Sequence, residues 1–384
     1  MSHVDELLAQ ACRQTGLSDF GGDEFREGLD VLVNALDREA RLNDMGRMAT
    51  DAQIVMLLGN RLQVEDWYRR HPEIDEQEIV APLIGLGLPR TGSSALGCLL
   101  GEDANVRSLR SWEVMWPCPP PDAATLAQEP RIAMAEASML RRAQVFPRMT
   151  AMLPSTATSP TECQLLMALD FKSQIFQPFG HVPSYAHWFF NKADLVPTYR
   201  YLKRVLKLLQ WRCPPNRWRL KNPTHSLFIT ALDEVFPDAR FVMTHRDACA
   251  VIPSVADLWY ELRRPYSDDV DMQVIGAETS AVFELGMHRM IAFRDAGQDH
   301  RFFDIYFAPF QKDPFPSIER LYDFLGETLS PEARAGMHEW WHHKTPEDRK
   351  YTRTDPALFG LDLDELRARF RFYDERFNVS RSVA

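Results

Sequence analysis

The segment IGLGLPRTGSS at residues 84–94 brings together the residue types that bind an anion. An apolar run enters a glycine- and proline-containing turn, and the following ALGCLLG is typical of the first turns of a helix. Arginine forks onto two oxygens of a phosphate or sulfate, glycine permits close backbone approach, and a helix N-terminus adds unpaired N–H groups. We therefore predict an anion site formed by Arg90, Thr91, Gly92, Ser93 and Ser94.

Two common nucleotide motifs do not fit this segment. A Walker A loop requires a lysine after its last glycine, whereas Ser93 follows Gly92 here. A dinucleotide fingerprint requires a third glycine, which GLGLPR lacks. The alternative to an anion site is a tight strand-to-helix turn with an incidental arginine.

A second polar group occurs in THRDACAVIPSVADLW at residues 244–259. Arg246 and Asp247 follow an apolar stretch with the pattern of a strand, and Asp247 is a natural helix cap. Ser254 lies eight residues after Arg246, near two helical turns further on. We expect Arg246 and Ser254 to meet the same ligand as the first loop. An exposed ion pair and an ordinary helical serine are the alternative.

The pattern of apolar residues predicts the elements that position these loops. Strands are expected at 78–88, 217–221, 239–246 and 300–307, separated by helices at 198–211, 226–236 and 316–326. This alternation predicts an α/β fold with a P-loop-like parallel sheet flanked by helices, whose ligand lies at the C-terminal strand ends. Residues 1–78 have helical periodicity, with a second helix beginning near Thr50. We divide the chain into a helical N-terminal extension, 1–78, and an α/β domain, 79–384.

The two loops together resemble those of the sulfotransferases that use PAPS, 3′-phosphoadenosine 5′-phosphosulfate. PRTGSS is similar to their phosphosulfate loop, often PRSGTT, and R-x7-S is similar to their 3′-phosphate site. FPDARFVMTHRD and FDIYFAPFQKDPFPSIERLYDFLG also look like this family, so the resemblance covers roughly 80–330. It is closest to a bacterial branch with an N-terminal helical extension. It implies PAPS as co-substrate, with PAP, the bisphosphate product, left after transfer.

The sequence departs from the family pattern in three places. Ser93 and Ser94 replace the usual threonines, and Ala248 replaces a frequent proline. The family's C-terminal RKGxxG loop has no clean match. Lys350 and Arg353, within HHKTPEDRKYTRTD, are the candidates to close over the 3′-phosphate.

Sulfuryl transfer requires a group that takes the acceptor proton and donors that stabilise charge on the sulfonate and leaving oxygens. His225 in RLKNPTH and Glu113 in SLRSWEVMWP are the two candidate bases. Lys221 is placed to touch the bridging or sulfonate oxygen. Trp112 and Trp116 would shield Glu113 and raise its pKa. The alternative for His225 is a structural histidine hydrogen-bonded to the backbone, and the alternative for Glu113 is a structural carboxylate paired with Arg90 or Arg110. The sequence does not decide which of the two residues is the base.

Composition limits the remaining possibilities. The 384 residues carry a net charge of −10, which disfavours a general nucleic-acid binder. The six scattered cysteines are typical of buried thiols in a reducing compartment. No apolar run is as long as a membrane-spanning helix, and the first residues do not have the pattern of a secretory signal. We therefore expect a cytoplasmic protein. No metal is expected, because an acidic Mg²⁺ motif is missing.

The acceptor is expected to be a small hydroxylated molecule. Segment 161–190 is rich in Phe, Trp and Met, which suits an apolar or aromatic acceptor such as a lipid, sterol or phenol. The alternative is a helical lid whose apolar side chains belong to the core. For His181 and His187 within the segment, a structural role is favoured over a place in the acceptor pocket. Two other functions stay open: a nucleotide-dependent phosphotransferase, and a non-catalytic protein that binds PAP or a lipid on the same fold. Oligomeric state is also open.

Overall fold

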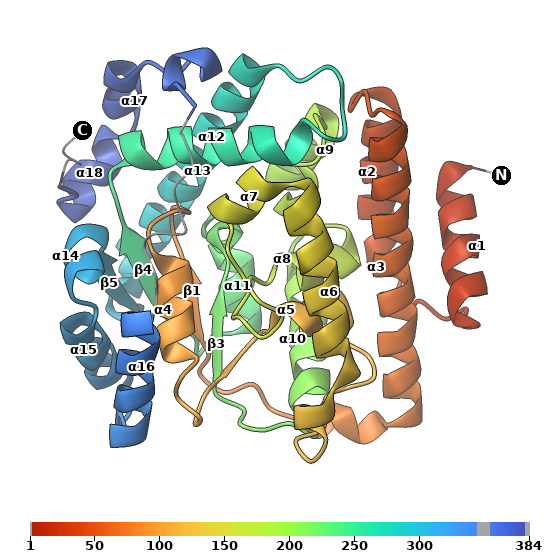
Figure 1. Ribbon diagram of the computed structural model, residues 1–384, viewed down its shortest axis with the longest axis horizontal. Coiled ribbons are helices and arrows are strands. Elements are labelled where there is room, and N and C mark those ends of the chain that lie inside the picture. Colours follow the sequence, from red (N-terminus) through yellow and green to blue (C-terminus); the bar gives the residue numbers. More distant parts are fainter. Residues whose placement is uncertain (1, 344–353, 381–384) are drawn as a thin grey trace.

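A computed structural model describes residues 2–343 and 354–380, and the strands in this part form one parallel, five-stranded sheet (Figure 1). The strand order is β2-β3-β1-β4-β5. The strands are β1 (Leu83–Leu86), β2 (Arg107–Ser108), β3 (Trp218–Lys221), β4 (Arg240–His245) and β5 (Phe302–Tyr306). This confirms the predicted α/β class, with helices on both faces of a parallel sheet.

The strands alternate their side chains between two apolar layers. Ile84, Phe241 and Met243 belong to the larger core, whereas Leu83 and Val242 belong to a smaller core on the opposite face. The register pairs Leu83 with Arg219 on one side and with Arg240 on the other. Strand β3 ends at Lys221, opposite Gly85, and β4 continues two residues past Met243, the partner of Leu86. The loops after β1, β3 and β4 therefore leave the sheet at the same edge.

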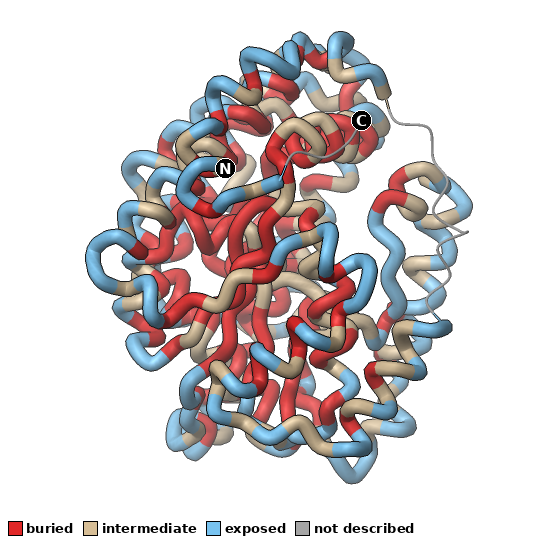
Figure 2. Tube along the Cα trace, turned by 90° about the vertical axis from the view of Figure 1, so that its left-hand side faces the viewer, coloured by how far each residue is buried: buried red, intermediate tan, exposed pale blue. Residues whose placement is uncertain are grey.

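Helices cover both faces of the sheet, and the buried chain between them forms the centre of the molecule (Figure 2). The smaller core is closed by α4 (Ser93–Leu100), α14 (Phe307–Lys312), α15 (Phe315–Leu325) and α16 (Pro331–His343). The larger core is closed by α10 (Val196–Gln210), α11 (Ile229–Val235), α12 (Ala248–Arg263) and α13 (Met272–Phe293). Because α4 follows β1 and α12 follows β4 on opposite faces, a crevice at this switch point suits a ligand.

Further helices surround this framework. They are α5 (Ser111–Met115), α6 (Pro130–Val145), α7 (Pro147–Met152), α8 (Gln164–Met167), α9 (Pro183–Asn191), α17 (Leu363–Arg369) and α18 (Arg371–Phe377). Short 3-10 or π turns occupy η1 (Pro72–Glu76), η2 (Leu126–Gln128), η3 (Ala168–Asp170), η4 (Gln174–Phe176), η5 (Pro223–Leu227), η6 (Arg294–Gln298), η7 (Asp299–Arg301) and η9 (Pro356–Phe359). No helix within 2–343 or 354–380 has the length and apolarity needed to cross a bilayer.

Several predicted boundaries were wrong. The helix expected near Thr50 begins at Asp44, because Asn43 caps it by accepting the Gly46 N–H at 2.8 Å. The segment 362–377, for which no element was predicted above, contains two helices, which separate at the fully buried Phe370. Strand β2 was not predicted, since two residues carry no readable period. Of the six cysteines, all with free thiols, only Cys118, Cys163 and Cys213 are buried.

The N-terminal helices α1 (His3–Thr15), α2 (Glu24–Arg38) and α3 (Asp44–Arg70) pack into the larger core (Figure 1). Arg61 of α3 is 2% exposed and donates to the carbonyls of Phe20, Gly22 and Leu169 at 2.8–3.3 Å. It also pairs with Asp170 at 3.4 Å. A buried guanidinium thus joins residues on both sides of position 78. The division into 1–78 and 79–384 stays a prediction.

Replacing Arg61 by methionine tests this connection. The variant leaves buried carbonyls without their donor and removes one cation from Asp170, which keeps Lys172 and Thr198 as donors. We therefore expect a loss of about 3–5 kcal/mol in the free energy of unfolding. Urea denaturation measures it. The control Arg200→Ala removes the exposed pair with Glu234 and should cost under about 1 kcal/mol. A two-step transition in which 79–384 keeps its wild-type stability would instead show that the extension folds independently.

Candidate active site

The anion loop runs from the end of β1 to the beginning of α4, and three of its residues have positive φ. Gly87 has φ 110° and donates its N–H to Ser226 Oγ at 2.9 Å. Gly92, the residue before α4, has φ 91°. Arg90 has φ 61°, which is uncommon for a residue with a side chain and is found at functional turns. The turn is therefore held in the conformation that the predicted anion cradle requires.

Arg90 connects the two predicted loops. Its Nε donates to Ser254 Oγ at 3.2 Å, and its Nη1 donates to the Met152 carbonyl at 2.8 Å. Its own carbonyl accepts from Arg246 Nη1 at 2.8 Å. The Arg246 guanidinium also lies over the Phe307 ring, 4.1 Å from its centroid. The structure thus brings Arg90, Arg246 and Ser254 together, although 164 residues separate the first from the last.

Three hydroxyl-bearing residues of the loop have different environments. Thr91 is fully buried, donates to the Leu88 carbonyl at 2.8 Å and lies 2.5 Å from Thr244 Oγ1, so it holds the loop on β4. Ser93 is partly exposed and Ser94 is exposed, so these two face a ligand-accessible region.

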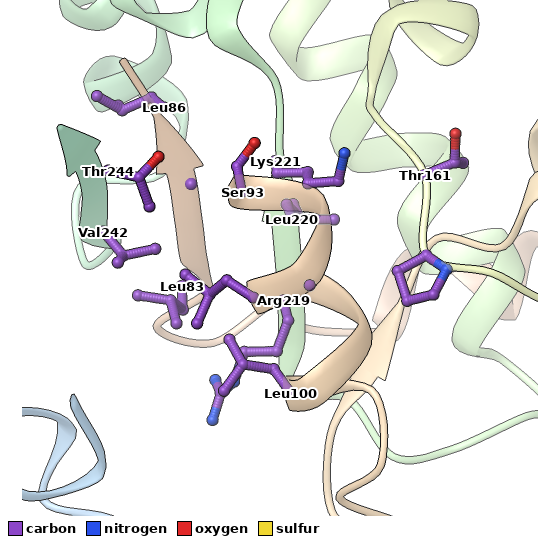
Figure 3. Close-up of a pocket in the computed structure, with 14 residues that line it drawn as sticks. Leu83, Leu86, Ser93, Leu100, Thr161, Arg219, Leu220, Lys221, Val242 and Thr244 are labelled. Carbon is purple, nitrogen blue, oxygen red and sulfur yellow. The ribbon is translucent and has the colours of Figure 1, made fainter. Parts of the chain in front are cut away.

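Lys221 at the end of β3 brings a cation to this region. Its Nζ lies 3.4 Å from Ser94 Oγ and 3.3 Å from Glu162 Oε1. Figure 3 shows Lys221 between Ser93 and Thr161, and all three line one cavity that lies between α4 and the strands β1, β3 and β4. Glu162 was missed in the sequence, because nothing in TSPTEC marks it as adjacent to a strand 59 residues later.

His225 lies in η5 and is completely buried. Its Nδ1 is 3.0 Å from the Tyr199 hydroxyl, and its Nε2 has no hydrogen-bond partner among the described residues. Burial lowers the pKa of His225 from 6.5 to about 3. The imidazole is therefore neutral at physiological pH. Its Nε2 can accept a proton only in the tautomer in which Nδ1 carries the ring proton and donates a hydrogen bond to the Tyr199 hydroxyl.

Glu113 is also buried, and both of its carboxylate oxygens are engaged. Oε1 accepts from Arg107 Nη2 at 2.5 Å, and Oε2 accepts from the Arg110 N–H at 3.0 Å. Glu113 is thus the N3 residue of a capping box that begins α5. The alternative of a paired carboxylate has the right character, but the partner side chain is Arg107 and not Arg90.

The other predicted positions are placed differently. Lys350 and Arg353 lie outside the described residues. His181 Nδ1 is 2.8 Å from Glu278 Oε1, and His187 is exposed. Phe171, Phe176, Tyr185 and Phe189 of the aromatic segment are buried in the core. In 2–343 and 354–380 no cluster of three or more His, Cys, Asp or Glu side chains is placed to hold a metal ion.

A parallel sheet flanked by helices, with an arginine-bearing turn, a second arginine and a lysine at one edge, defines the class: an α/β protein that gathers three cations at its switch point. Comparison with known proteins gives the family. The model of the sulfotransferase family matches residues 82–331, and the chain belongs to this family.

Several similar proteins come from mycobacteria. A crystal structure of sulfotransferase STF9 from Mycobacterium avium has a TM-score of 0.93 and 31% identity, covering 100% of this chain and 99% of that chain. STF1 from Mycobacterium tuberculosis H37Rv has a TM-score of 0.85 and 30% identity, covering 96% and 98%. The omega-hydroxy-beta-dihydromenaquinone-9 sulfotransferase Stf3 of Mycobacterium bovis and of M. tuberculosis is 31% identical over 136 residues. That match spans 33% of this chain and only 34% of each relative.

Gly92→Ala tests the geometry of the loop. An added Cβ would sit at φ 91°, 3.3 Å from Gln311 Nε2 and 3.4 Å from Phe307 Cδ2. We expect a loss of about 1–2 kcal/mol from the left-handed backbone alone, with more from the contacts. The control Gly16→Ala has φ 70° and nothing within 4 Å, so it isolates the backbone cost. Equal losses in urea denaturation would contradict a tightly enclosed loop.

The buried His225 should make stability depend on pH. Its folded pKa of about 3 lies below the ordinary 6.5, so the unfolded chain binds a proton that the native protein does not. Stability is therefore complete above about pH 6.5 and falls as the pH drops toward 3, by roughly 2 kcal/mol between pH 7.5 and 5. Urea denaturation of His225→Gln should lack this part of the pH dependence. An unchanged pH dependence would show that His225 is solvated.

Proposed function

We propose that this protein transfers a sulfuryl group from PAPS to the hydroxyl of a small apolar or aromatic acceptor. The observation that carries the proposal is the network in which Arg90 joins Ser254 and Arg246. These are the residues that the resemblance assigns to the two ends of one donor. They come from two loops far apart in the sequence, and Arg90 is hydrogen-bonded to each of the other two.

The residues at the crevice suit a phosphosulfate. Arg90 and Arg246 supply planar guanidinium groups, which match phosphate and sulfate oxygens. Ser93 and Ser94 add hydroxyls, and the first turn of α4 adds N–H groups with the positive end of the helix dipole. PAPS would supply the activated sulfuryl group. The chain's own residues bind it, orient it and stabilise the negative charge that develops during transfer.

Lys221 is the residue we assign to the transferring group. Its Nζ reaches Ser94 Oγ, so its charge lies over the beginning of α4. A preorganised cation at that position stabilises charge on the sulfonate and leaving oxygens without rearrangement. Of the two bases that the sequence predicts, His225 is fully buried and Glu113 is paired with Arg107.

The acceptor is proposed to be apolar. The Met152 carbonyl that accepts from Arg90 ends α7, so α7 lies beside the donor loop. Three large apolar side chains of α6, Met134, Leu140 and Val145, and one just after α7, Leu153, are exposed by 41–64%. Exposed apolar side chains on the segment that ends beside Arg90 suit a lipid or another hydrophobic alcohol. The printed name of Stf3, which describes a hydroxylated menaquinone, agrees with an acceptor of this class.

Thermal shift with PAP and with ATP-Mg²⁺ tests the donor site. PAP at about 100 times its Kd should stabilise the wild type by roughly 2.7 kcal/mol. Arg246→Ala should lose this stabilisation relative to its own unliganded form, whereas Arg246→Lys should keep part of it. Arg320→Ala, which removes an exposed arginine on α15, should respond like the wild type.

Three outcomes would contradict the proposal. Stabilisation by ATP-Mg²⁺ and not by PAP would identify a phosphotransferase. A PAP response that persists undiminished in Arg246→Ala would place the donor elsewhere. PAP binding without any sulfuryl transfer would identify the non-catalytic alternative.

A further inference from the structure

Glu162 is a carboxylate that neither the motifs nor the family resemblance assigned, and it lies at the centre of the proposed reaction site. It follows Thr161, which lines the cavity with Ser93 and Lys221. Its Oε1 is 3.3 Å from Lys221 Nζ, and the same Nζ is 3.4 Å from Ser94 Oγ. The carboxylate, the ammonium and the anion loop therefore form one continuous group.

The backbone holds Glu162 in place from both sides. The Thr161 N–H donates to the Leu109 carbonyl at 2.8 Å, beyond the end of β2. The Cys163 N–H donates to the Lys221 carbonyl at 3.1 Å, at the end of β3. Glu162 thus spans two neighbouring strand ends at the edge where the donor loop lies. A residue so fixed is preorganised, which is what a residue at a reacting centre requires.

Accessibility separates Glu162 from the other candidates. Its side chain is 34% exposed, so an acceptor hydroxyl can reach it. Glu113 is 1% exposed and uses both oxygens for Arg107 and the Arg110 N–H. His225 is 0% exposed, and its ring faces Tyr199. A base must come within hydrogen-bonding distance of the proton that it takes.

We propose that Glu162 is the catalytic base of the transfer; this inference rests on the proposed function. The carboxylate takes the acceptor's hydroxyl proton as the acceptor oxygen forms a bond to sulfur. The sulfur–oxygen bond to the phosphate breaks, and its electron pair stays on the leaving phosphate oxygen, where Lys221 and the loop stabilise the charge. Lys221 then serves two groups, the carboxylate before transfer and the anion during it.

The experiment uses acceptors that differ in their need for a base. With PAPS and PAP-release detection, Glu162→Gln should slow transfer to 1-octanol, to phenol and to water by about 100-fold or more. Transfer to 4-nitrophenol at pH 9, where this acceptor is already ionised, should fall by less than about tenfold. Glu162→Asp, which keeps the carboxylate, should recover part of the lost rate. PAP binding, followed by thermal shift, should stay within about twofold for both variants.

Comparison variants make the outcome specific. Glu234→Gln removes an exposed carboxylate of α11 and should behave as the wild type. His225→Gln and Glu113→Gln report on the two predicted bases with the same acceptors. The pH–rate profile must account for Lys221 and the buried Cys163 thiol, the titratable groups beside Glu162.

The possible failures are distinguishable. Equal slowing of ionised and un-ionised acceptors, or wild-type rates in Glu162→Gln, overturns the assignment of Glu162 while PAP binding and transfer by the wild type stand. A selective loss in His225→Gln or Glu113→Gln instead assigns the base there. Absence of a PAP response in the wild type, or PAP binding without transfer to any of the acceptors, overturns the proposed function itself.

Discussion

The contact on which this site depends is the hydrogen-bonded connection through Arg90. Its guanidinium reaches Ser254 on α12 and the Met152 carbonyl at the end of α7, while its carbonyl accepts from Arg246 after β4. These contacts require the left-handed backbone at φ 61°. Such a conformation costs of order 1–3 kcal/mol and persists only where surrounding contacts fix it. Thr91, buried against Thr244, is one of those contacts.

The sheet explains why these contacts can form at all. In a parallel sheet the C-terminal ends of adjacent strands face the same edge, and the register here pairs Gly85 with Lys221 of β3 and Leu86 with Met243 of β4. Lys221, Arg90 and Arg246 follow these three strands, so the topology gathers three cations without any of them being close in sequence. In a chain of net charge −10, a local gathering of this kind is what an anion site requires.

The sequence predicted the parts of the site that follow strands directly. The polar residues after β1, β3 and β4 could be placed because a buried strand has a readable apolar pattern, and the parallel-sheet rule then positions its end. Glu162 could not be found in this way. It lies in an irregular segment whose position depends on hydrogen bonds to Leu109 and Lys221. The state of Glu113 was equally hidden, because its partner Arg107 lies in a strand of only two residues.

Burial divides the residues of the proposed site into two groups with different tasks. Thr91, Glu113 and His225 are buried, so they shape the loop, the beginning of α5 and the turn after β3. Arg90, Lys221, Arg246 and Glu162 are partly exposed and stand where a substrate can touch them. Because a group must contact the reacting atoms to transfer a proton, exposure is a stricter criterion for a base than residue type. By that criterion the structure favours Glu162, the carboxylate beside Lys221, over the buried His225 as the base.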